Sequence, residues 1–325
     1  MNTRSSYCRV LCLALALLGC ENPFDARGPL EQKMAVFSIL STDQNVQFVR
    51  VEQGYMPEQF DPTSFTDVTY LTDAQVTVNL TNLPKVTSRT WVLRDTVLPR
   101  ADTSRYKYPV HAFTAKFRPI RGGSYRVEIV HPRLGTVSAI VNLPNPAGAT
   151  PHSSSKNIFS TPRSYSDSSS IVFILGMWAP AFICRMYVDY EVLLDGEWTT
   201  QRVEIPAGYQ SSDSHDYAHV FYPGLVRTGP WFPFVTFKNE LYQKALANVA
   251  YDKYLTNKII FDRVVMQIVS VDSNLCKYLS PDVDPHSMRL DAPMYYKIDG
   301  GFGVLGGYSL DSTVFLLPED FSFNH

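Results

Sequence analysis

The sequence predicts a mainly β protein, in which an N-terminal β-sandwich of immunoglobulin-like or transthyretin-like type precedes a second β-rich domain with one amphipathic helix. Three observations predict this class. The chain holds 19 Tyr, 19 Phe and 22 Pro against 17 Gly, a balance that suits short strands joined by turns. Short segments of alternating apolar residues recur between turn residues. Apolar residues make up 45% of the 325 residues, enough for two packed domains.

The first domain is predicted over residues 31–145. In its clearest strand, which follows Gly122-Gly123, Tyr125, Val127 and Ile129 alternate with polar residues, the period of a half-buried strand. A turn over residues 131–135 leads into a partner strand at 136–141, so the two form a hairpin. Further strands are predicted at Met34–Leu40, Val46–Val51 and Ala74–Leu80.

Residues 146–170 are predicted to be a linker. Between Pro144 and Ser170 the chain has nine Ser and four Pro in 27 residues, so this stretch has little apolar surface to bury. We place the boundary between two domains here. The alternative is a long surface loop inside one domain, held down by apolar residues such as Ile158 and Phe159.

The second domain is predicted over residues 171–325. Asp195-Gly196 is a two-residue turn signal between strands at 185–194 and 197–205, which predicts a hairpin. Asn239–Asn257 is predicted to be a helix, because Leu241, Ala245 and Val249 recur on one stripe, with Tyr242, Leu246 and Ala250 beside it. Other strands are predicted at 171–175, 258–270 and 312–317.

The N-terminus predicts export and lipidation. Arg4 and Arg9 precede an apolar run over Val10–Leu18, the order of a secretory signal, and the run is too short to span a bilayer. The following Leu17-Leu18-Gly19-Cys20 resembles the lipobox of bacterial lipoproteins. That resemblance implies a signal peptide over residues 1–19, cleavage after Gly19, and acylation (palmitate) of Cys20, with residues 20–30 as a tether to the membrane lipid.

Charge and cysteine content bear on the expected partners and on disulfide bonding. The formal charge is −2, from 29 basic and 31 acidic residues, so a nucleic-acid partner is not expected. After loss of Cys8 and Cys12 and acylation of Cys20, two cysteines remain, Cys184 and Cys276. Two alternatives stay open for this pair: one disulfide, or two buried free thiols.

Two short motifs are candidate sites of chemistry. Gly301, Gly303 and Gly306 have the spacing of the glycines in a dinucleotide-binding motif. That motif also needs a helix directly after the glycines and an acidic residue about 20 positions later, and neither is predicted here. We therefore expect these glycines to allow tight backbone packing instead. His215 and His219 are weak metal candidates, because in an extended chain they stand roughly 13 Å apart. We therefore expect no metal, no cofactor and no catalytic residues; a secreted-side hydrolase is the minor alternative.

An aromatic segment is the candidate partner or ligand surface. Trp231, Phe232 and Phe234 alternate with Pro230 and Pro233, and such a segment is awkward in a central strand. It is therefore either a rigid binding loop or a plug of the second domain's core.

The order of several weak motifs resembles a known family. Ala74–Val78, Gly123–Ile129, Ser270–Leu279 and Ile298–Tyr308 are similar to the outer-membrane lipoproteins of Bacteroidetes that are encoded beside TonB-dependent receptors, a family with no assigned reaction. The resemblance implies a lipid-anchored, surface-exposed location in the outer membrane. It also implies an accessory or binding role with such a receptor in nutrient uptake. The alternative is a structural or adhesion lipoprotein of the cell surface without a transport partner.

Overall fold

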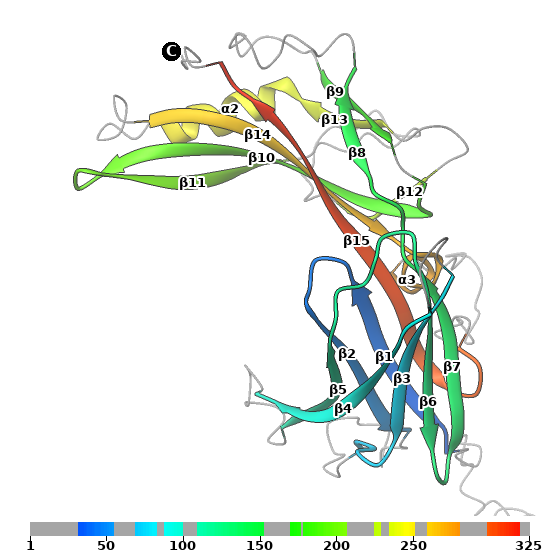
Figure 1. Cartoon of the computed structure of the whole chain (residues 1–325). Coiled ribbons are helices and arrows are strands. Elements are labelled where there is room, and N and C mark those ends of the chain that lie inside the picture. Colours follow the sequence, from blue (N-terminus) through cyan, green and yellow to red (C-terminus); the bar gives the residue numbers. More distant parts are fainter. Residues whose placement is uncertain are drawn as a thin grey trace, which may run out of the picture. The chain divides into compact units, whose positions relative to one another are not determined.

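The fold is described from a computed structural model. It covers residues 32–54, 69–82, 88–99, 109–152, 170–176, 178–206, 224–228, 234–250, 259–279 and 298–318. The described strands and helices belong to one compact unit, Lys33–Gly54 and Val68–His325. The chain is mainly β, as predicted, and the described residues include two helices. Figure 1 shows the long strands.

The strands of the first half are those that alternation predicted, with two more. They are β1 (Met34–Ser41), β2 (Val46–Gln53), β3 (Gln75–Asn82), β4 (Thr90–Leu98), β5 (Val110–Lys116), β6 (Ser124–His131) and β7 (Gly135–Asn142). Strand β4 pairs with β3 through residues 90–93 and with β5 through residues 94–98. It therefore connects the layer β1-β2-β5 to the layer β3-β6-β7.

The two layers enclose one core, which makes this half β-sandwich-like. Val36, Val49, Val76 and Val127 come from four different strands and are each fully buried. Their neighbours in sequence point outward because side chains alternate across a strand. The alternation seen in the sequence thus decides which face is buried.

The second half places a sheet against a smaller sheet and a helix. Strands β11 (Glu197–Ile205), β10 (Ala181–Leu194), β14 (Ile259–Val271) and β15 (Phe302–Leu316) lie side by side, and β12 (Val226–Arg227) also pairs with β10. The smaller sheet is β13-β9-β8, with bounds Phe234–Lys238, Ser170–Gly176 and Gly148–Pro151. Buried side chains from both sheets and from helix α2 (Asn239–Ala250) form one core, which includes Phe173, Phe182, Phe237, Leu246 and Met266.

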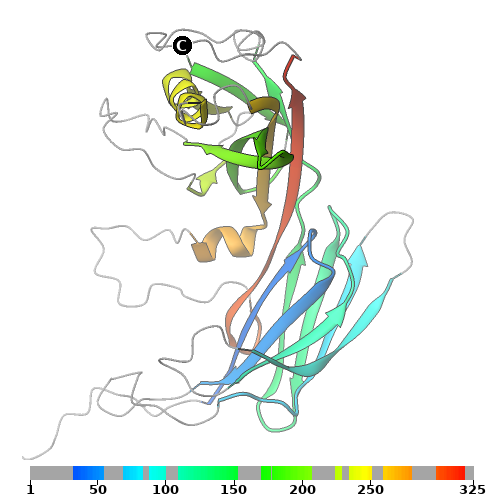
Figure 2. The same cartoon turned by 90° about the vertical axis from the view of Figure 1, so that its left-hand side faces the viewer.

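Strand β15 belongs to both halves. Residues 302–308 pair in parallel with β1 of the sandwich, and residues 308–316 pair antiparallel with β14. Figure 2 shows this strand running from the sandwich into the second half. The sequence predicted only 312–317 as a strand here. The structure differs because the glycines of residues 300–307, which lower strand propensity, are needed for close packing.

The region predicted to be a linker also differs from expectation. Residues 148–151 form β8, because Ala149 is buried in the core and the strand pairs with β9. Residues 153–169 lie outside the described residues, so the division into two domains at this point stays a prediction.

A second helix, α3 (Ser273–Leu279), was not predicted. Its seven residues are too few to show a helical period. Its position depends on the side chains of Asp272 and Asn274. Asp272 Oδ1 accepts hydrogen bonds from the backbone of Leu275 (2.8 Å) and Gly307 (3.1 Å), and Asn274 Nδ2 donates to the carbonyl oxygens of Ile140 (3.0 Å) and Leu305 (2.9 Å). The two side chains therefore attach α3 to β15 and to β7.

Burial of Asp272 predicts a pH-dependent stability. Burial raises the pKa of this carboxyl from 3.8 to about 6, so between about pH 4 and pH 6 the folded state binds more protons than the unfolded state. The contribution of this group is full below pH 4 and is lost as the pH rises through 6, by about 3 kcal/mol at most. Asp272→Asn keeps an acceptor oxygen and removes this dependence. Urea unfolding at pH 4.5 and at pH 7 measures how the free energy of unfolding changes with pH. If that change is the same for Asp272→Asn and for the wild type, the assignment to Asp272 is contradicted.

Candidate functional site

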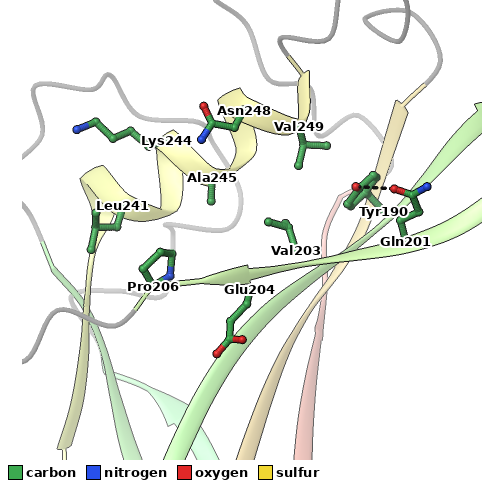
Figure 3. A pocket seen from close by; sticks show the side chains of 10 residues that line it. All are labelled: Tyr190, Gln201, Val203, Glu204, Pro206, Leu241, Lys244, Ala245, Asn248 and Val249. Atoms are coloured by element: carbon green, nitrogen blue, oxygen red, sulfur yellow. Dashed lines mark hydrogen bonds between the residues drawn. The ribbon is translucent and has the colours of Figure 1, made fainter. Parts of the chain in front are cut away.

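An open groove lies between helix α2 and strand β11. It has a volume of about 610 Å³, and Figure 3 shows its lining side chains. They come from the helix, from β11 and the residue after it, and from the neighbouring strand β10. The lining residues are Tyr190, Gln201, Val203, Glu204, Pro206, Leu241, Lys244, Ala245, Asn248 and Val249.

The helix side of the groove is an apolar stripe. Leu241, Ala245 and Val249 follow each other at intervals of four, so they lie on one face of α2. The adjacent Tyr242 and Leu246 are fully buried in the core and fix the rotation of the helix. The predicted helix is confirmed over residues 239–250; residues 251–257 of the prediction lie outside the described residues.

The strand side adds one apolar contact and a polar end. Val203 points from β11 toward the helix, and Glu204 points away to the other face (Figure 3). Tyr190 donates a hydrogen bond of 2.9 Å from its hydroxyl to Gln201 Oε1. Burial raises the pKa of Tyr190, so its hydroxyl stays protonated at neutral pH.

Charge is nearly absent from the groove itself. Lys244 is turned away from the groove in Figure 3, and its Nζ is 2.9 Å from Glu240 Oε1 on the exposed side of the helix. What the groove offers is therefore apolar surface with amide and hydroxyl groups at its rim. Such a surface fits an uncharged ligand that has an apolar side and a few hydrogen-bonding groups.

The opposite face of β10 and β11 carries an ion cluster in which a buried aspartate is bound by two exposed arginines. Asp189 on β10 accepts from Arg202 on β11 (2.5 and 3.0 Å) and from Arg263 on β14 (2.9 Å). The hydrogen bond from Arg202 is the main reason that the pKa of Asp189 is lowered. The guanidinium of Arg202 also lies 5.0 Å from the centre of the Tyr187 ring. These contacts fix β11 against its neighbours.

Most residues that the sequence singled out lie outside the described residues. These are Gly19, Cys20, His215, His219, Trp231 and Phe232, so their roles stay predictions. Phe234 is the first residue of β13, where its backbone pairs with Ile174. Within the described residues, no three His, Cys, Asp or Glu side chains lie close enough together to hold a metal ion.

The two remaining cysteines are not bonded to each other. Cys184 on β10 and Cys276 on α3 are both buried thiols that form no disulfide, which selects the second of the two alternatives. Burial raises the pKa of the Cys184 thiol to about 12, so this thiol is protonated and unreactive at neutral pH.

Sequence reasoning missed the groove. It predicted the β10–β11 hairpin and the helix, and even the stripe of Leu241, Ala245 and Val249, but not that the stripe faces β11. No local signal in a single sequence states which strand a distant helix crosses.

Among the described helices, none is both long and apolar enough to cross a membrane.

Comparison with known proteins adds little to this geometry. No protein-family model matches the chain, and no curated protein matches. One similar solved structure is the C-terminal globular domain of an oligosaccharyltransferase from Pyrococcus abyssi, at 9% identity and a TM-score of 0.23. The match covers 92% of this chain and 52% of that one, so this chain spans about half of its length. A TM-score this low supports no inference about fold or function.

Proposed function

We propose that this chain is a lipid-anchored accessory protein of the outer membrane that holds a ligand in the α2–β11 groove and works with a TonB-dependent receptor in nutrient uptake. The observation that carries the binding role is the groove itself. Anchoring is supported by the Leu17-Leu18-Gly19-Cys20 motif. The receptor as partner is supported by the resemblance of the ordered motifs to lipoproteins encoded beside such receptors.

The groove suits an uncharged molecule with an apolar side. Its middle is formed by Val203, Ala245 and Val249, and its polar groups at the rim include the amides of Gln201 and Asn248. Those amides supply both donors and acceptors, so they can orient the hydroxyl or amide groups of a ligand. Two charged side chains belong to the lining, Lys244 and Glu204. Lys244 is paired with Glu240, and Glu204 points to the other face of the sheet, where its Oε1 is 3.8 Å from Arg185 Nε, so neither is placed to pair with a charged ligand in the middle of the groove.

A charge placed in the groove tests this role. We expect Val203→Asp to weaken saturable binding of the uncharged apolar dye N-phenyl-1-naphthylamine by about tenfold or more, because a carboxylate must lose water beside the apolar ligand. The matched control is Val92→Asp on β4, where the side chain is 67% exposed. Dye fluorescence titration measures both. Equal affinity for the two variants, or binding that does not saturate, would contradict a ligand site in this groove.

A further inference from the structure

Among the described strands, β11 has a free edge. It is the last strand in the order of its sheet, and all nine of its residues pair with β10. No described strand lies on its other side. Its first six residues, 197–202, are exposed. Exposed edges are usually guarded by charged side chains, above all Lys, by Pro or by a bulge. Strand β11 has no Lys, no Pro and a regular register with β10; its charged residues are Glu197, Arg202 and Glu204.

The hairpin turn decides which residues present that edge. Asp195 and Gly196 both have positive φ, 50° and 89°, as in a two-residue turn whose flanking pair, Leu194 and Glu197, is hydrogen-bonded. Bonded pairs then alternate along an antiparallel hairpin. The backbone groups of Trp198, Thr200 and Arg202 therefore point away from β10. The side chains of these three residues share one sheet face because they are spaced two residues apart. It is the face that carries Asp189 of β10, which lies opposite Arg202.

We propose that a second copy of this chain pairs with this edge, as an antiparallel β11–β11 contact about a two-fold axis at Thr200. In this register Thr200 lies opposite Thr200 of the partner subunit. Trp198 lies opposite Arg202 of the partner subunit, and the symmetry repeats this contact. Trp198 is 49% exposed in the single chain. The Arg202 guanidinium is held by Asp189 on β10, yet the Arg202 side chain is still 46% exposed, so the indole ring of a second copy can lie against it, which is a favourable pair. Threonines directly across from each other also stabilise a sheet.

Self-complementarity favours a copy of the chain over a foreign strand. The same three residues supply both sides of the contact, as an interface with two-fold symmetry requires. Shifting the register so that Arg202 meets Arg202 of the partner subunit would oppose two like charges, which is destabilising. Shifting it so that Trp198 meets Glu204 of the partner subunit would lose the cation–π pairs. The register at Thr200 avoids both.

Disulfide trapping in the full chain tests the contact. In the proposed register the two Thr200 Cα atoms are about 5.5 Å apart, within the range for a disulfide. The matched control is Thr199→Cys, whose two copies would be more than about 7 Å apart. We expect mild oxidation to give at least about ten times more reducible dimer from Thr200→Cys than from Thr199→Cys, on a non-reducing gel. The wild-type chain gives the background of the native cysteines.

A second variant separates pairing from chance collision. Thr200→Pro removes an N–H that points to the free edge, so it leaves the bonds to β10 intact while blocking a partner strand. We expect it to remain folded by circular dichroism and to be monomeric by light scattering at concentrations where the wild type dimerises. Equal trapping of both cysteine variants, a wild type that stays monomeric, or trapping of Thr200→Cys to another protein instead of to itself would overturn the proposal.

Discussion

Replacing Gly303 with alanine is expected to lower the free energy of unfolding by about 3–5 kcal/mol. Gly303 lies on β15 opposite Val36 of β1, with φ of +112°, a conformation that residues with a side chain rarely adopt. A Cβ added there would overlap the carbonyl oxygen of Val36. Because that oxygen belongs to the backbone of a paired strand, it cannot move aside without breaking the parallel pairing.

The measurement is urea unfolding followed by circular dichroism. The matched control is Gly148→Ala on β8, where the nearest atom to an added Cβ is Thr313 Oγ1 at 3.9 Å; it should change stability by less than about 1 kcal/mol. If Gly303→Ala unfolds at the same urea concentration as Gly148→Ala, then the close contact of β15 with β1 is not what holds the sandwich to this strand.

Replacing Cys20 with alanine is expected to abolish lipidation and to release the protein from membranes. The predicted anchor depends on the thiol of Cys20, and without acyl chains a protein of formal charge −2 lacks a basic surface to hold it at anionic lipid. Labelling of cells with an alkyne fatty acid, followed by membrane fractionation, measures both effects. Cys276→Ala, which removes a buried thiol, should keep label and location. Label that survives in Cys20→Ala would contradict the anchor.

Local patterns were sufficient to predict most strands of this fold. The β10–β11 hairpin follows from alternation on both sides of Asp195-Gly196, and both residues adopt the positive φ that the turn needs. Helix α2 follows from its apolar stripe. In both cases the sequence pattern that predicts the element lies within about ten residues. The prediction does not depend on which distant residues the element packs against, as long as they are apolar.

The remaining elements depend on contacts between distant residues. The Gly-rich start of β15 was not predicted to be a strand, because its glycines are explained by close contacts with distant segments. An added Cβ would press on Val36 of β1 at Gly303, on Leu275 of α3 at Gly306, and on Val141 of β7 at Gly307. Helix α3 was missed because it is held by distant hydrogen bonds: Asp272 accepts one from the backbone N–H of Gly307 on β15, and Asn274 donates one to the carbonyl oxygen of Ile140 on β7. No periodicity in a single sequence carries such information.

In the candidate site, too, local patterns predicted the single elements but not the contacts between them. Leu241, Ala245 and Val249 were predicted to share a stripe, and Val203 to lie on a strand, but their meeting across a groove depends on how the chain returns after β13. The aromatic segment with Trp231 and Phe232 stays a prediction. Among the described residues, the groove is therefore the candidate binding surface.

The central claim is that this protein works at the membrane beside a TonB-dependent receptor. The most direct test is to solubilise outer membranes in mild detergent, purify the lipidated chain through an affinity tag, and identify what elutes with it by mass spectrometry. We predict that a TonB-dependent receptor co-elutes in near-equal amount with the wild-type chain. Recovery of the chain without any such receptor, from membranes in which the receptor is present and intact, would contradict it.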